Sequence, residues 1–169
     1  MTVKKYRSFW NISLDAGGGT DVPDDTDLTP DTQGFTPPDI VRELITVPTG
    51  GYANERVLGR LQDMTCTVML TSNYNQLSNI GESYEFDVEE DLIDNAGGVK
   101  ETVTYTVVGR LQSRSPGQSS HDNSPRPMTL TFTVDQYIEK HTGIDHDTFQ
   151  IDLEANPQVI KQNGVSMFP

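Results

Sequence analysis

The sequence predicts a mainly β protein: an antiparallel β-sandwich or barrel with two long hairpins and one short α-helix. Apolar and polar residues alternate over much of the chain, as they do in strands that bury one face. In two stretches the polar positions are mostly threonine, a β-branched residue that favours strands. Clusters of Gly, Pro, Asp and Asn separate the alternating stretches, and these residues are typical of turns.

The N-terminal part predicts one strand, a long loop and the first hairpin. Residues 9–15 alternate, and 15–38 are rich in Gly, Pro and Asp with hardly any apolar residue, which predicts an acidic surface loop. Residues 39–70 predict the first long hairpin, with a turn around Gly50 and Gly51. In its return strand the apolar side chains of Met64, Cys66, Val68 and Leu70 face one way, and Thr65 and Thr67 face the other.

The middle of the chain contains the one helix candidate, residues 71–81. Tyr74, Leu77 and Ile80 have helical spacing there, and Gly81 is suited to end the helix. Residues 83–91 alternate again and predict a strand. Its inward positions are Tyr84, Phe86 and Val88, and its outward positions are Glu85, Asp87 and Glu89.

The second long hairpin, 102–138, has the clearest pattern. A loop at 113–127 separates two alternating strands. The inward set is Val103, Tyr105, Val107, Leu111, Met128, Leu130, Phe132 and Val134, and the outward set is Thr102, Thr104, Thr106, Thr129, Thr131 and Thr133. A one-residue register error would expose five or six large apolar side chains, at roughly 1.5–3 kcal/mol each, so this assignment is favoured. Residues 139–169 predict a C-terminal strand and an Asn-Gly turn.

The tetrapeptide GRLQ occurs at 59–62 and again at 109–112. The similarity extends to the two residues before the motif, where Val57 matches Val107 and Leu58 resembles Val108, and then stops on both sides, so an internal repeat is not supported. One copy falls in the return strand of the first hairpin and the other in the outgoing strand of the second. We therefore expect two strands with similar roles rather than a duplicated unit.

Length and charge limit the function classes. The chain has 169 residues, which suits a single domain over 1–169, and a net charge of −13. A DNA-gripping surface needs clustered Lys and Arg, so this charge argues against one, although DNA can still pass without being held. The N-terminal MTVKKYRSFW has no long apolar run, and no stretch reaches the ~18 apolar residues of a membrane span, so we expect cytoplasmic assembly without membrane insertion.

Catalytic and metal-binding motifs are not found. The sequence has no G-x-S-x-G, P-loop, H-E-x-x-H or C-x-x-C, which favours a protein that is not an enzyme and needs no cofactor. The single cysteine, Cys66, excludes a disulfide framework and is interpreted as a core thiol. His141 and His146 flank acidic residues, and solvated loop histidines are favoured there over a metal site. The acidic run 21–31 lacks the glycine of an EF-hand, having Thr26 in its place.

Three stretches, in order, resemble the major tail tube protein of contractile-tailed bacteriophages and R-type pyocins. They are GGYANERVLGRLQDMTCTVML, TVTYTVVGRLQSRSPGQ and IDLEANPQVIKQNGV. The resemblance runs from about residue 39 to the end of the chain. The acidic segment 15–38 has no counterpart in the family, the helix is shorter, and Ser166 stands where an aspartate often follows Asn-Gly-Val.

The resemblance implies a virion structural protein that forms six-fold rings, which stack into the inner tube of a contractile tail. Two hairpins of each subunit would join a closed inner β-barrel, so both GRLQ strands would belong to that barrel. The implied partners are further copies of the chain, the tail sheath, the tape measure protein, and the baseplate and tail terminator proteins. DNA would pass through the lumen without specific binding during genome ejection.

Two sets of residues have roles on this interpretation. Thr104, Thr106, Thr129, Thr131 and Thr133 are the candidates that line the lumen, where a net negative charge would repel DNA phosphates. Gly50, Gly51 and Tyr52 are the candidates for contact between rings, with the glycines making the turn and Tyr52 the apolar contact.

Two other functions stay open at this point. One is a tube protein of a non-viral contractile injection or secretion apparatus, which delivers effectors. The other is a monomeric ligand-binding β-sandwich, in which the threonine faces are simply solvent faces. Trp10 is the only tryptophan, and it lies in an alternating strand rather than in an aromatic platform. This position makes the ligand-binding β-sandwich the less favoured of the two functions.

Overall fold

The computed structural model describes residues 7–17, 26–49, 52–71, 79–93, 99–117, 126–143, 147–155 and 158–167. Most of the described residues lie in antiparallel strands, so the predicted mainly β class is confirmed. In chain order the elements are β1 (Arg7–Gly17), β2 (Thr26–Asp27), the 3-10 helix η1 (Thr29–Asp31), β3 (Thr32–Thr36), β4 (Arg42–Thr49), β5 (Tyr52–Leu61), β6 (Thr65–Leu70), β7 (Ser83–Ile93), β8 (Val99–Pro116), β9 (Met128–His141), β10 (Phe149–Asp152), β11 (Val159–Gln162) and β12 (Val165–Ser166).

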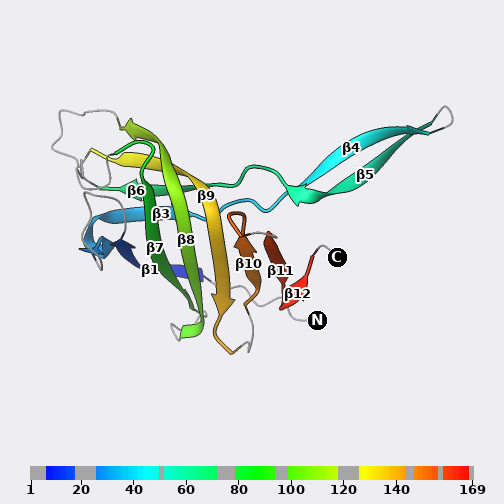
Figure 1. The fold of residues 1–169 in the computed structure, drawn as a ribbon. Coiled ribbons are helices and arrows are strands. Elements are labelled where there is room, and N and C mark those ends of the chain that lie inside the picture. Colours follow the sequence, from blue (N-terminus) through cyan, green and yellow to red (C-terminus); the bar gives the residue numbers. More distant parts are fainter. Residues whose placement is uncertain are drawn as a thin grey trace.

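β9 is the centre of a ten-stranded sheet. β8 pairs with it along one edge from end to end, and the other edge is shared by β6, along Met128–Thr133, and β10, along Gln136–Glu139. From β8 the sheet continues through β7 and β1 to β2, from β6 it continues to β3, and from β10 through β11 to β12. β4 and β5 form a separate two-stranded hairpin that projects from the body (Figure 1).

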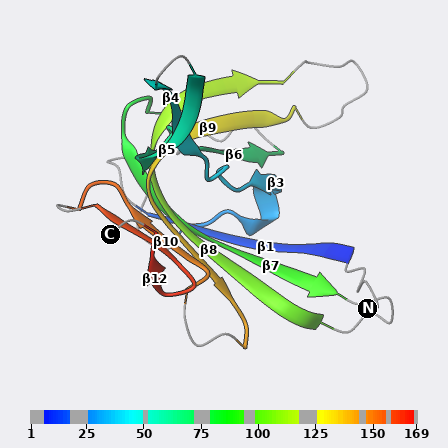
Figure 2. The same ribbon diagram turned by 90° about the vertical axis from the view of Figure 1, so that its right-hand side faces the viewer.

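The sheet curls until its two ends face each other (Figure 2). The ring of Phe35 on β3 lies 5.5 Å from that of Tyr105 on β8 and 6.2 Å from that of Phe86 on β7, although β6 and β9 separate β3 from β8 in the sheet. Such contacts need a sheet that folds over its own inner face. The apolar positions of each strand point into this space and form the core. Its largest members are Tyr84, Tyr137, Phe86, Phe132, Leu28 and Met64.

The segment 15–38 is not one surface loop, and that prediction was wrong for its described part. Residues 15–17 complete β1, and β2, η1 and β3 occupy 26–36. Leu28 has no exposed surface, and Phe35 packs against the core. Two apolar residues in a polar run give no periodic signal, so burial by the rest of the fold decides the outcome. Residues 18–25 lie outside the described part.

The prediction of one hairpin over 39–70 was also wrong. The β4–β5 ladder ends at the pair Arg42 and Leu61, and after a three-residue connection β6 enters the large sheet between β3 and β9. The two GRLQ copies therefore differ in setting: the first ends the projecting hairpin, and the second lies within β8. Most of the predicted helix, residues 72–78, lies outside the described residues, and 79–81 form a turn.

The second hairpin is β8 with β9, and it is longer than predicted because β8 runs to Pro116 and β9 to His141. At the C-terminus β10 lies within the predicted strand, and β11 and β12 form a small hairpin around Asn163 and Gly164. Both turn residues have positive φ, 50° and 73°, which Asn and Gly adopt at least cost.

Candidate assembly surface

The five threonines that the sequence assigns to a lumen lie on the sheet face opposite the core. Each is half-buried and alternates with buried apolar residues of the same strand. β6 adds Thr65 and Thr67 to this face, because they pair with Thr133 and Thr131. We call these seven residues the threonine face: Thr65, Thr67, Thr104, Thr106, Thr129, Thr131 and Thr133.

The threonine face consists of two groups along the β8–β9 hairpin. Thr131 and Thr133 lie between β6 threonines on one side and Ser113 and Arg110 of β8 on the other. Thr104 and Thr106 lie further along, opposite Lys140 and Ile138. The sequence predicts the face of each residue correctly but not this separation, which follows from the register of the two strands.

Arg110 of the second GRLQ copy lies between the two groups. A bulge in β9 at Asp135 brings Gly109 opposite Val134 and Arg110 opposite Thr133. The Arg110 guanidinium lies 3.4 Å from Asp135 and 3.2 Å from Glu154. The Arg110 side chain is 59% exposed, so these ion pairs orient it and contribute only about 0–1 kcal/mol to stability.

An acidic row on β7 borders the threonine face. Glu85, Asp87 and Glu89 are exposed and pair with Val108, Thr106 and Thr104 of β8. The Thr106 hydroxyl donates a 2.6 Å hydrogen bond to Asp87, and the Thr102 hydroxyl donates a 2.7 Å bond to Asp91. The surface next to the threonines is therefore negative, as the net charge of the chain suggests. The alternation in 83–91 predicts the exposure of these acids, but not which strand they pair with.

The projecting hairpin carries the candidates for contact between rings. Tyr52 is the first residue of β5 and pairs with Thr49, the last residue of β4, so it lies at the far end of the hairpin. Gly50 and Gly51 lie outside the described residues. In the described part of the chain, β4 and β5 pair with each other and with no third strand.

A groove of about 340 Å³ lies where this hairpin leaves the body. The connections 37–41 and 62–64 form its rim together with outer-face residues of β3 and β6. Val41 in this rim is 44% exposed, and Asp39 and Asp63 add two carboxylates. The groove is open and mostly polar, and it holds no arrangement of acid, base and nucleophile.

Two further kinds of site, a reactive thiol and a metal centre, can be checked in the described part of the chain. Cys66 is buried, and burial raises the pKa of its thiol to about 12, so it is an inert core residue as the sequence suggests. Within the described ranges, no three His, Cys, Asp or Glu side chains are placed to hold a metal ion. Among those same residues, no helix is long and apolar enough to span a bilayer.

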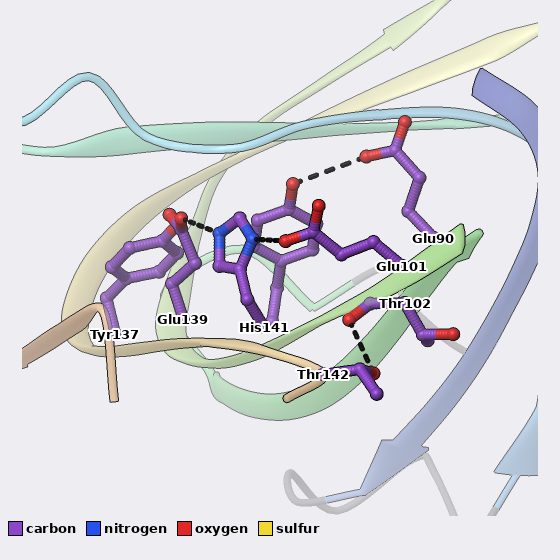
Figure 3. A network of polar contacts seen from close by, with 8 residues as sticks. Glu90, Glu101, Thr102, Tyr137, Glu139, His141 and Thr142 are labelled. Carbon is purple, nitrogen blue, oxygen red and sulfur yellow. Dashed lines mark hydrogen bonds and ion pairs between the residues drawn. The ribbon is translucent and has the colours of Figure 1, made fainter. Parts of the chain in front are cut away.

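His141 is not a solvated loop histidine, and that interpretation was wrong. It is the last residue of β9 and lies between Glu101 and Glu139 (Figure 3). Its ring is half-buried, and neither partner is one of the aspartates near it in the sequence. Glu101 is distant in sequence and only the β8–β9 pairing brings it close, so no local pattern signals the contact. His121 and His146 lie outside the described residues.

Comparison with known proteins adds evidence on the fold. No protein-family model matches the chain, and no curated protein matches it. Among solved structures, a chain of the "PVC sheath-tube complex in extended state" of an extracellular contractile injection system is 16% identical, with 76% of this chain and 87% of that chain covered and a TM-score of 0.49. A chain of the "PVC sheath/tube terminator in extended state" is 13% identical, with 82% and 99% covered and a TM-score of 0.52.

The chain has a mainly β fold similar to that of the matched chain in the sheath/tube terminator structure. At 13% identity this likeness concerns the backbone alone, and one fold can serve several functions. The function therefore has to be argued from the surfaces described above.

Proposed function

We propose that this protein is a structural subunit that assembles into hexameric rings, and that the rings stack into the inner tube of a contractile apparatus. The observation that carries the proposal is the projecting β4–β5 hairpin on a body of tube-like fold. A two-stranded hairpin with no hydrophobic core of its own is only marginally stable in water. Its edges also invite pairing with other chains, which a closed ring of subunits satisfies.

The threonine face and the acidic row support a role as the channel wall. Half-buried threonines give a polar surface without large side chains, and the neighbouring β7 carboxylates keep it negative. Such a wall would repel DNA phosphates, so a genome would slide past it without being held. In this proposal both groups of the threonine face point into the lumen, and the sheath contacts the other side of the ring.

A second candidate is a tube that delivers protein effectors instead of DNA. The similar sheath/tube terminator structure belongs to an extracellular contractile injection system, which favours this candidate over a ligand-binding sandwich. In either case the partners are the sheath, the terminator, the baseplate and the tape measure protein. An acidic channel would favour passage of acidic or neutral cargo and would retard basic cargo.

Electron microscopy of the full chain tests the proposal. Negatively stained protein is examined across a concentration series, alone and with baseplate proteins encoded beside it, and sedimentation velocity follows the same samples. We expect monomers at low concentration and six-fold rings or tubes at high concentration or on the baseplate. A protein that stays monomeric under all of these conditions would contradict the proposal and favour the ligand-binding sandwich.

A further inference from the structure

A polar cluster occupies the inner face of the sheet where β8 begins and β9 ends (Figure 3). Val103 and His141 are the last pair of the β8–β9 ladder, and one further main-chain bond follows, from the Thr142 N–H to the Thr102 carbonyl at 2.9 Å. Gly143 then turns the chain with a φ of +86°. The side chains of this cluster are therefore placed to hold or release the end of the ladder.

The His141 ring contacts one carboxylate on each strand. Its Nδ1 lies 2.5 Å from Glu101 Oε1 of β8, and its Nε2 lies 2.8 Å from Glu139 Oε1 of β9. The three side chains are 24%, 28% and 18% exposed, so water reaches them only in part. Both ring nitrogens thus face an acceptor in a partly dry site.

Two tyrosines and a third carboxylate surround these groups. The Tyr137 hydroxyl donates to the second oxygen of Glu139 at 2.7 Å, and the Tyr105 hydroxyl donates to Glu90 of β7 at 3.2 Å. Burial, followed by the nearby glutamates, raises the pKa of both phenols, so they stay protonated donors at physiological pH. On the β10 side, the residue that pairs with Glu139 is the apolar Phe149.

Among the described residues, His141 is the group that can bring a positive charge into this cluster. Among the described residues, no lysine or arginine forms an ion pair with Glu90, Glu101 or Glu139. A neutral imidazole has one N–H and one bare nitrogen, so it donates to only one of two carboxylates. An imidazolium donates to both, and hydrogen bonds between ionised partners are roughly twice as strong as neutral ones.

We propose that His141, Glu101 and Glu139 form a proton-operated clasp at the end of the β8–β9 ladder. With the imidazolium present, Glu101 and Glu139 are tied through one ring, and the Thr142–Thr102 bond is held closed. When the proton leaves, one carboxylate faces a bare nitrogen and two negative charges face each other. The clasp then opens, and the turn after β9 loosens while the rest of the sheet stays paired.

The sign of the pH dependence follows from the folded structure. Burial lowers the pKa of His141, but the contacts with Glu139 and Glu101 outweigh it, so the folded pKa lies above the ordinary value of 6.5. The stabilisation by the clasp is thus fully present below about pH 6.5 and is lost as the pH rises through the folded pKa. A pH above the folded pKa of His141 therefore opens the clasp, and a pH below it closes the clasp.

Nuclear magnetic resonance on the full chain, at a concentration where it is monomeric, tests the clasp. The His141 ring is titrated, and hydrogen exchange of the Thr142 amide is measured across the same pH range and corrected for the intrinsic rate. We expect a titration midpoint above 6.5. Protection of the Thr142 amide should fall as His141 loses its proton. The expected fall is about tenfold for each pKa unit by which the closed clasp raises the His141 pKa.

Substitutions distinguish the effect of the clasp from the effect of removing any one charge. Glu101→Gln and Glu139→Gln should each lower the His141 midpoint, and His141→Gln should remove the pH dependence of Thr142 protection. Glu89→Gln is the matched control, because Glu89 carries the same charge on the exposed face of β7. It should leave both readouts near those of the parent chain.

Three results would overturn the proposal. They are a midpoint at or below 6.5 in the parent chain, equal pH dependence of Thr142 protection in the His141→Gln variant, and a Glu89→Gln effect as large as that of Glu101→Gln. If His141→Gln does not fold, Glu101→Gln and Glu139→Gln still decide, because both variants keep the imidazole. None of these readouts depends on tube assembly, so the clasp and the proposed function can fail separately.

Discussion

Gly109 of β8 lies directly against the main chain of β9: a Cβ at this position would stand 2.7 Å from the Thr133 carbonyl oxygen. The obstacle is backbone and not a flexible side chain, so the two strands would have to separate to admit it. We therefore expect Gly109→Ala to lower the free energy of unfolding by about 1–3 kcal/mol, the usual cost of overpacking. Urea denaturation of the monomer measures this change.

Gly81→Ala is the control for Gly109→Ala. A Cβ at 81 would meet nothing within 4 Å, but φ is +94°, so only the backbone conformation is penalised. We expect a cost of about 1 kcal/mol there. If Gly109→Ala is as stable as the parent protein, the close approach of β8 and β9 at the bulge is not present in solution.

Adjacent residues on β9 test the assignment of the two sheet faces. Phe132 is fully buried and its ring lies 5.1 Å from that of Phe86, so Phe132→Ala should cost about 3–5 kcal/mol. Thr131 is half-buried on the opposite face, and Thr131→Ala should cost about 1 kcal/mol or less. Chemical denaturation compares them, and similar losses for both variants would mean that the register is wrong.

Positive charge on the threonine face tests whether it lines the channel. Thr129 and Thr131 pair with Ser115 and Ser113 on β8 and with Met69 and Thr67 on β6, so no charged residue is directly opposite either of them. Thr129→Lys with Thr131→Lys should leave the subunit folded, and the charge is repeated in every subunit of a ring. We expect assembled particles that release DNA slowly, with a defect that eases as salt rises.

The matched control replaces the same two threonines by glutamine, which is similar in length and uncharged. This variant should release its cargo at the normal rate. Unfolded lysine subunits would indicate that the threonines belong to the core. Normal release from the lysine variant at low salt would place the threonine face away from the DNA path.

The far end of the β4–β5 hairpin should be needed for ring stacking. Tyr52 pairs with Thr49 at the end of the hairpin that projects from the body, so Tyr52→Asp should not affect the melting temperature of the monomer. We expect single rings in place of long tubes, because a carboxylate would be buried without a partner between rings. Tube length in electron micrographs is the measurement, with Tyr52→Phe as the control. Tubes of normal length from the aspartate variant would assign the hairpin another role.

Alternation in the sequence predicts most of the large sheet, because a strand buried on one face must repeat every two residues. The buried set from Val103 to Val107 and from Met128 to Val134 follows the predicted pattern. Leu28 is missed because a single apolar residue has no period. The departure of β6 from the hairpin is missed because the apolar pattern continues after the connection 62–64, and only pairing with β3 and β9 reveals the break.

The threonine face and the clasp depend more strongly than the strands do on contacts between residues that are distant in sequence. The outward direction of the threonines is local information, but their division into two groups depends on the register and on the bulge at Asp135. The clasp joins His141 to Glu101, which are 40 positions apart and belong to different strands. Glu139 is only two residues from His141, but sequence spacing gives no sign of Glu101, because that contact depends on the pairing of β8 with β9.

A cryo-electron microscopy map of the assembled tube is the most direct test of the claim that this chain forms the wall of a delivery channel. We predict six-fold rings, with the β4–β5 hairpin paired to a neighbouring subunit and the threonine face, with the β7 acidic row beside it, turned toward the lumen. A tube whose lumen is lined by another face of the sheet would contradict this account of the channel. Failure to form rings or tubes at any concentration, even on a baseplate, would contradict the assembly itself.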